Sequence, residues 1–167
     1  MHRPRGRERP LKAKLTACLL AIVLLAAVPA TARAFSAETW RSDLLHRINH
    51  YRHEHGLHRL TIGTRLQRAA TSHSVAMATH QMLSHSSWSG ASWLTRIRAY
   101  GFKGAWAGEN LAVGLWTPRH TMRAWRASRD HNANMLNRHF RVIGIGIVRG
   151  SWSGHKAYYI TADFGGP

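Results

Sequence analysis

The hydrophobic pattern of this chain changes its period towards the C-terminus, and this change constrains the fold more than any other feature. Residues 142–148 and 156–164 are apolar runs rich in β-branched and aromatic side chains, and the glycine-containing residues 150–154 separate them. This pattern predicts two strands joined by a hairpin loop. The residues before them follow helical spacing. Helices first and strands last favour an α+β layer arrangement.

Four helices are predicted in the first part of the chain. The first covers residues 38–54, where apolar residues from Trp40 to Tyr51 recur every three or four positions and Gly56 follows the end. His73 falls on the apolar face of the second helix, which favours a hydrogen-bonded core residue. The other helices are predicted from Thr64, as the N-cap, to Met82, from 91 to 100, and from Pro118, with Thr117 as its cap.

The N-terminus has the features of a secretory signal peptide. Basic residues precede a short apolar run, residues 17–30, and a small-x-small triplet follows, so we predict a signal peptide over residues 1–34, cleaved after Ala34. An uncleaved membrane anchor is the alternative, but the run is shorter than the roughly 20 residues of a spanning helix. Cys18, the single cysteine, lies in this leader. Residues 35–167 are therefore predicted to be a single secreted or periplasmic domain with no disulfide and no transmembrane anchor.

The predicted domain is strongly basic. The leader holds seven of the 24 Lys and Arg residues and one of the seven acids, which leaves 17 basic and 6 acidic residues. Such a surface attracts polyanions, among them envelope lipids, wall polymers and extracellular DNA. The arginines form no basic cluster and no nucleic-acid motif. We expect an anionic envelope polymer, a lipid or a glycan as partner, and no specific nucleic acid.

One acid and one base stand out in this acid-poor chain. Glu109 lies between Gly108 and Asn110 in what we predict to be a tight turn, and His131 follows within an apolar frame. A carboxylate and an imidazole in one site can bind a metal or relay a proton. They can equally serve only to hold a loop.

The residues around this acid and base resemble the CAP superfamily of cysteine-rich secretory proteins, antigen 5 and pathogenesis-related proteins, in its compact bacterial form. The matching segments are Ala107-Gly-Glu-Asn-Leu-Ala-Val-Gly114, Trp125-x-x-Ser128-x-x-His131-x-x-Asn134-x-Leu136 and Ile48-Asn49-x-x-Arg52-x-x-x-Gly56-Leu57-x-x-Leu60. The resemblance runs from Leu44 to Phe164. It implies an α-β-α sandwich, with an antiparallel sheet between helices.

The resemblance also implies a central cavity formed by His85, Glu109, Ser128 and His131. In several family members the two cavity histidines bind zinc, which makes His85 and His131 the candidate metal ligands and zinc the candidate cofactor. In the alternative interpretation these residues form a hydrogen-bonded network that braces the loops. Asn110, Asn134 and Trp125 then serve as structural parts of the motif.

Two departures from the family pattern bear on this cavity. Ser128 occupies the place of a second Glu in eukaryotic members, so that carboxylate is missing. Arg129 and Asp130 replace a Pro-Gly pair common in bacterial members. Without this built-in turn, the sequence does not determine the angle at which His131 enters the cavity. We expect the side chain of Asp130 to point away from the cavity, because adjacent helical side chains diverge.

Histidines and tryptophans outside the cavity suggest further surfaces. His46, His50 and His53 lie on one side of the first helix. His46 and His50 have the i, i+4 spacing of a surface metal site. A solvated polar face is the favoured interpretation. Five tryptophans in or near loops are predicted to form an exposed ligand groove: Trp88, Trp93, Trp106, Trp116 and Trp152.

Three functions are compatible with these features. The first is a binding module for a lipid, glycan or envelope component with a His/Glu cavity. The second is a zinc-dependent hydrolase in which His85 and His131 hold the metal and Glu109 is the candidate catalytic base. The third is a structural or interaction domain with an inert cavity. We favour binding, because the sequence contains no recognisable nucleophile. A hydrolase would also need a second carboxylate near the cavity, and only Asp130 is available nearby.

Overall fold

The computed structural model describes residues 36–114 and 116–167, which belong to one compact unit. The predicted signal peptide and its cleavage site lie outside the described residues. The helices are α1 (Ala37–Glu54), α2 (Thr64–His80), α3 (Trp93–Ala99), α4 (Pro118–Ala127) and α5 (Arg129–Met135), and the strands are β1 (Thr61–Ile62), β2 (Trp106–Gly114), β3 (Val142–Trp152) and β4 (His155–Gly166). The predicted α+β class is confirmed.

The strands of the described chain form one sheet in the order β1-β3-β4-β2. Strand β4 pairs antiparallel with β3 on one side and β2 on the other. Strand β1 pairs parallel with β3, so the sheet is antiparallel except at this two-residue edge. This exception is possible because β1 and β3 are far apart in the chain, and no hairpin fixes their direction.

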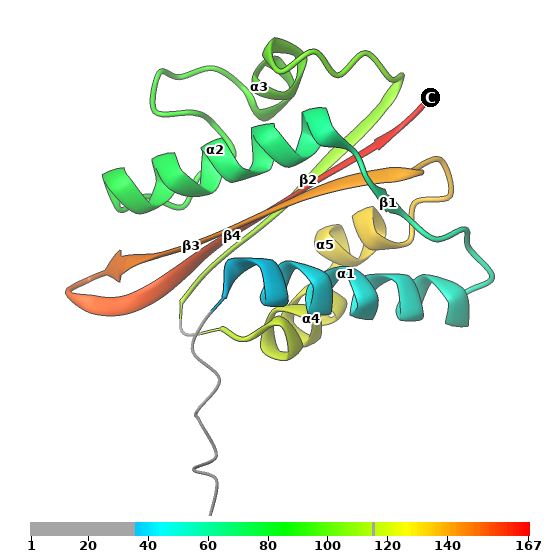
Figure 1. The fold of residues 1–167 in the computed structure, drawn as a ribbon, viewed down its shortest axis with the longest axis horizontal. Coiled ribbons are helices and arrows are strands. Elements are labelled where there is room, and N and C mark those ends of the chain that lie inside the picture. The colour runs from blue at the N-terminus through cyan, green and yellow to red at the C-terminus, as the bar shows by residue number, and fades with distance from the viewer. Residues whose placement is uncertain (1–35, 115) are drawn as a thin grey trace, which may run out of the picture. The chain divides into compact units, whose positions relative to one another are not determined.

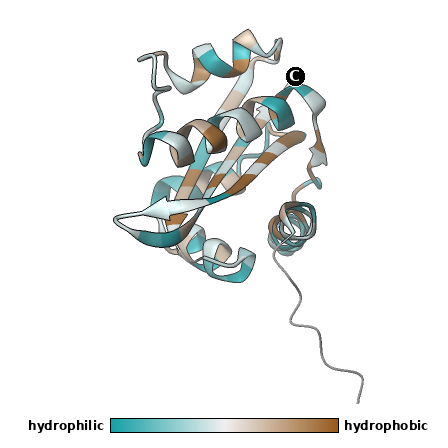
Figure 2. Ribbon diagram, turned by 60° about the vertical axis from the view of Figure 1, so that its left-hand side comes forward, coloured by the Kyte–Doolittle hydropathy of each residue, from teal (hydrophilic) through white to brown (hydrophobic). Residues whose placement is uncertain are grey.

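The helices cover both faces of the sheet, which gives the expected α-β-α sandwich. Helices α2 and α3 lie on one face, and α1, α4 and α5 lie on the other (Figure 1). Hydrophobic stretches of the strands lie between these layers (Figure 2). Helix α2 packs closely because Gly144 and Gly146 face it: a Cβ at either position would lie about 2 Å from the helix backbone at Leu66 or Ala70.

The helix ends follow the predicted signals in most places. Thr117 caps α4 through its side chain, and Pro118 is the first helical residue, as predicted. Thr64 was expected to cap α2, but it is the first helical residue, and Gly63 takes the cap position without a side-chain hydrogen bond. Helix α2 ends at His80, before the predicted Met82, because Gln81 adopts a left-handed conformation.

The β3–β4 hairpin is tighter than predicted. The expected loop 150–154 is wrong, since residues 150–152 continue the ladder with residues 155–157. Only Ser153 and Gly154 form the turn, with φ angles of +51° and +80°. Two consecutive positive φ angles are the geometry of a turn that follows the natural twist of the strands.

Two polar residues of α1 hold the chain that follows it. Asn49 donates to the Leu60 carbonyl (2.9 Å) and accepts from the Leu60 amide (2.7 Å). Arg52 is fully buried, and burial, together with the charge of Arg141, lowers its pKa to about 10. Its guanidinium donates to the carbonyls of His58, Met135, Asn137 and Phe140. These bonds explain why Asn and Arg interrupt the apolar face of this helix.

Candidate functional site

Glu109 lies in the middle of β2 and not in the predicted turn. The glycine before it does not break the strand, because Gly108 pairs in register with Phe164. Its role is close packing instead: a Cβ at Gly108 would lie 2.7 Å from Oδ1 of Asn134 and 2.9 Å from Phe140. Since β2 is an edge strand, the site opens along the border of the sheet.

Two cationic groups engage the carboxylate of Glu109. Its side chain is 1% exposed, and its two oxygens are held separately, Oε2 by the buried Arg96 of α3 and Oε1 by Nδ1 of His85 at 2.7 Å. Arg96 also donates to the backbone carbonyl of His85 (3.1 Å) and so fixes the loop that carries this histidine. Sequence reasoning missed Arg96, because a short helix with several arginines looks solvent-exposed.

The contact with Glu109 sets the protonation of His85. The hydrogen bond to Glu109 is the main cause that raises the pKa of His85; the negative charge of Glu109 adds to it, while partial burial and Arg96 oppose it. The imidazolium therefore persists to higher pH than in a free histidine. His85 remains 55% exposed, so its Nε2 side faces the solvent-accessible part of the site.

Helix α5 and Ser128, the residue between α4 and α5, form the opposite wall of the site. Ser128 separates the two helices in an extended conformation (φ −93°, ψ 125°), so the chain breaks here without the Pro-Gly pair of other bacterial members. His131 follows on α5 and is half-buried. Burial lowers the pKa of His131, and the nearby charge of His85 lowers it further, while Asp130 raises it.

Two asparagines attach α5 to β2. Asn110 donates to the carbonyl of His131 (3.0 Å), and Asn134 donates to the carbonyl of Glu109 (3.0 Å) and to Oδ1 of Asn110 (2.9 Å). Trp125 of α4 donates its indole N–H to the carbonyl of Leu111 (3.1 Å). Asn134 and Trp125 thus occupy the carbonyls of Glu109 and Leu111 on the edge strand, which leaves this part of the edge unsuited to pairing with another strand.

A cavity of about 420 Å³ lies between these two walls. Its lining includes four predicted cavity residues, His85, Glu109, Ser128 and His131. Asn110 and Trp125, predicted as structural residues, are absent from this lining. The expectation that Asp130 points away is wrong, since Asp130 lines the cavity. The full lining is His85, Trp93, Ala107, Gly108, Glu109, Ser128, Asp130, His131 and Asn134.

A second carboxyl group lies next to Glu109, although the sequence suggested only Asp130. Asp163 of β4 is the register partner of Glu109 and is fully buried. Burial raises the pKa of Asp163 well above its usual range, and the charge of Glu109 raises it further. Its two oxygens lack a hydrogen-bond partner among the described residues. An Asp in an otherwise apolar strand was the signal in the sequence.

Zinc is the cofactor that the resemblance implies, and the donor set can be tested against it. Catalytic zinc sites use three protein ligands. Both oxygens of Glu109 are engaged, and Nδ1 of His85 is taken, which leaves Nε2 of His85, the ring of His131 and the carboxylate of Asp130. Among the described residues no group of three or more His, Cys, Asp and Glu side chains could hold a metal ion. The residues therefore do not fit a zinc centre in this arrangement.

The tryptophans do not form the predicted single groove. Trp88 stacks on His80, with ring centroids 4.0 Å apart, and Trp106 stacks on His139 at 3.8 Å. Trp93 lines the cavity beside Glu109. Trp152 packs with the cluster around Tyr159.

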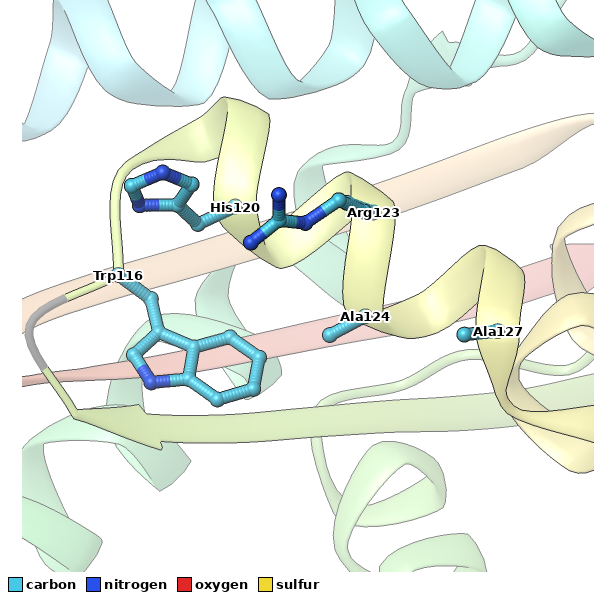
Figure 3. A pocket seen from close by; sticks show the side chains of 5 residues that line it. All are labelled: Trp116, His120, Arg123, Ala124 and Ala127. Atoms are coloured by element: carbon cyan, nitrogen blue, oxygen red, sulfur yellow. The ribbon is translucent and has the colours of Figure 1, made fainter.

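The fifth tryptophan, Trp116, lines a separate cavity of about 620 Å³ beside α4. The indole and Ala124 give this cavity an apolar side, and His120 and Arg123 add polar groups from the same helix (Figure 3).

Comparisons with known proteins agree with this architecture. The sequence profile of the cysteine-rich secretory protein family, CAP, matches residues 45–164. The protein YkwD of Bacillus subtilis (strain 168) is 30% identical over 118 residues, which are 71% of this chain and 46% of YkwD. The chain therefore spans less than half the length of this relative.

Solved structures share the fold at lower identity. An outer surface protein from Borrelia burgdorferi has a TM-score of 0.68 at 20% identity, over 79% of this chain and 96% of its own. An extracellular protein containing an SCP domain from Bacillus anthracis str. Ames has a TM-score of 0.63 at 21% identity, over 80% of this chain and 44% of its own. The fold, the profile match and the cavity motif lead to one conclusion: this chain belongs to the cysteine-rich secretory protein (CAP) family.

Proposed function

We propose that this chain is an exported binding module whose cavity between α3, α5 and the edge of β2 takes a glycan unit of the cell envelope. The observation that carries the proposal is the ion pairing of Glu109. With its carboxylate held by Arg96 and His85, the site presents hydrogen-bonding groups in fixed positions on this wall. Fixed polar groups in a concave site select a ligand by orientation.

The remaining lining suits a polar ring. Trp93 supplies an aromatic surface, and Ser128, His131 and Asn134 supply donors and acceptors on the facing wall. The lowered pKa of His131 keeps this ring neutral near pH 7, so that one nitrogen donates and the other accepts. Cavities of this volume accommodate small ligands of a few hundred Å³.

Export is supported by the leader and by the family. Residues 1–34 have the order of a signal peptide. The names of two structural neighbours describe an outer surface protein and an extracellular protein. Within the described residues, no helix is long and apolar enough to cross a membrane. The leader and the two names support our proposal that the protein acts outside the cytoplasm, in the periplasm or beyond.

Zinc-dependent hydrolysis is the alternative for the same cavity, and it has less support. It requires a third ligand that the described residues do not supply and a free carboxylate base, whereas Glu109 is bound on both oxygens. A third alternative, an inert cavity, is consistent with the hydrogen bonds of Asn110 and Asn134. The same binding measurements separate all three.

The test is saturation-transfer NMR with a panel of envelope glycan fragments on the purified protein. We expect signals for one class of fragment, lost in Trp93→Ala and in Asn134→Ala and retained in Trp88→Ala, the matched control, whose indole is 67% exposed outside the cavity. Equal signals in all four proteins would refute the cavity site. Zinc calorimetry on the wild type and on His85→Ala/His131→Ala completes the test, since zinc binding lost in the double variant would favour the hydrolase.

A further inference from the structure

The outer side of α1 carries a second group of histidines that the cavity does not use. His46, His50 and His53 follow one another at spacings of four and three residues, so their side chains lie on the same helix face. All three are exposed. They line a hollow of about 250 Å³ together with Asn49 and Arg59. A hollow bordered by three imidazoles and a guanidinium is a different kind of site from the cavity at β2.

The backbone that supplies Arg59 is held rigidly against α1. Asn49 clamps both backbone groups of Leu60, at 2.9 and 2.7 Å. On the other side of Arg59, the carbonyl of His58 accepts from Nε of Arg52 at 2.8 Å. Arg59 therefore projects from a segment fixed on both sides, and its place beside the histidines is built into the fold.

The charges around this hollow favour an anion as ligand. Two acids of α1 are already paired with basic side chains. Glu54 lies 3.4 Å from His50, and Asp43 lies 2.9 Å from Arg47. The segment that follows α1 adds further basic groups, His55, His58 and Arg59. Helix α4, which packs against α1, places Arg126 over the ring of Tyr51.

A bound metal cation is a poorer match for the same residues. Arg59 keeps its positive charge at all accessible pH values and repels a cation. No group of three His, Cys, Asp or Glu residues in the described part of the chain is arranged to hold a metal ion. A histidine pair at i, i+4 alone gives only two ligands.

We propose that His46, His50, His53 and Arg59 form a site for a phosphate group. Arg59 supplies a guanidinium donor, and each imidazole adds an N–H donor for phosphate oxygens. The phosphate can belong to a wall polymer or to a lipid head group, which share this chemistry. Such a site would hold the domain on the envelope while the glycan cavity remains free.

The test is calorimetric titration of the purified protein with inorganic pyrophosphate. We expect the variant His46→Gln/His50→Gln/His53→Gln to bind about tenfold more weakly than the wild type, because it loses three of the four proposed donor side chains. Arg59→Gln should also weaken binding, because it removes the guanidinium. His155→Gln, an exposed histidine on the β3–β4 hairpin, is the matched control and should bind as the wild type does.

Each other outcome overturns the proposal. Wild-type affinity in the triple variant would exclude the histidines. Equal losses in the control and in the triple variant would reduce the effect to the general basic charge. Nickel or zinc binding that disappears in the triple variant, without phosphate binding, would make the site a metal pair. Vesicles of phosphatidylglycerol and phosphatidylcholine, compared with a soluble polyglycerol phosphate, then separate the lipid from the polymer.

Discussion

Glu109 of β2 and Asp163 of β4 lie directly opposite each other in the antiparallel register, so two buried carboxyl groups share one place in the sheet. Glu109 is ion-paired with Arg96 and His85, whereas Asp163 has no hydrogen-bond partner among the described residues. Two adjacent carboxylates do not both ionise readily. The structure therefore assigns the negative charge to Glu109 and the proton to Asp163.

The substitution Asp163→Asn should stabilise the protein at neutral pH. Because the folded pKa of Asp163 is raised above its ordinary value of 3.8, the folded state binds this proton more tightly than the unfolded state. The contribution of Asp163 to stability thus falls as pH rises from that value through the folded pKa. Asn removes this pH-dependent cost, and we expect the variant to be more stable than the wild type near pH 7, by an amount that grows as the pH rises.

Urea unfolding of the wild type and the variant, followed across pH, measures this gain. The difference between the two proteins should shrink towards zero below about pH 4, where Asp is protonated in both states. A variant that is less stable than the wild type at neutral pH would show that the structure needs an ionised Asp163.

The contribution of His85 to stability should depend on pH in the opposite sense to that of a buried neutral histidine. Since its folded pKa is raised, the ion pair with Glu109 contributes fully below the ordinary value of 6.5 and is lost as pH rises through the folded pKa. His85→Gln should therefore lower Tm most in mildly acidic solution and least in alkaline solution. NMR titration of the His85 ring gives the pKa directly; a value at or below 6.5 would contradict the ion pair.

The sequence predicted the elements more completely than it predicted the site. Helical spacing, the Thr117-Pro118 cap and the β-branched and aromatic apolar runs of the last strands are local signals, and each identified its element. The turn predicted at Glu109 was wrong because a glycine can mark either a turn or a place where another residue packs close to the backbone. At Gly108 the neighbour is Asn134, distant in the chain, and only the folded structure brings it close.

The site residues that sequence reasoning missed are those whose role depends on long-range pairing. Arg96 looks like a surface residue until the fold places Glu109 against it. Asp163 becomes a partner of Glu109 only through the β2–β4 register. By contrast, His85, Glu109, Ser128 and His131 were found because the family motif already includes these contacts, and the structure places them in one cavity lining.

Gly108→Ala tests how tightly α5 is held on the edge strand. The added Cβ would lie 2.7 Å from Oδ1 of Asn134 and 2.9 Å from Phe140, so one of these side chains must move. We expect a loss of about 1–3 kcal/mol in unfolding free energy, typical of overpacking. Because Asn134 joins α5 to β2, the ring resonances of His131 should also shift. Ala112→Gly, elsewhere on β2, is a control for a backbone change in the strand, and it should leave His131 unchanged.

Glu109→Gln tests whether an ionised Asp163 can replace Glu109 as the negative partner of Arg96. Without the carboxylate of Glu109, Arg96 remains buried and unpaired, a loss that typically costs about 3–5 kcal/mol. The charge that Glu109 placed beside Asp163 is also gone, so the pKa of Asp163 should fall and its carboxylate should ionise next to Arg96. We therefore expect Glu109→Gln alone to cost less than this amount.

The double variant Glu109→Gln/Asp163→Asn removes both carboxylates and should show the full cost, although Asp163→Asn alone is stabilising. Asp163→Asn would then stabilise the wild type and destabilise the Glu109→Gln variant. A double-mutant cycle of unfolding free energies near pH 7 measures this coupling between the two residues. Adding Arg96→Met to the double variant should restore much of the stability, because it removes the unpaired cation. Additive effects of the two single substitutions would mean that Asp163 does not respond to Glu109, and would refute the coupling between the two carboxyl groups.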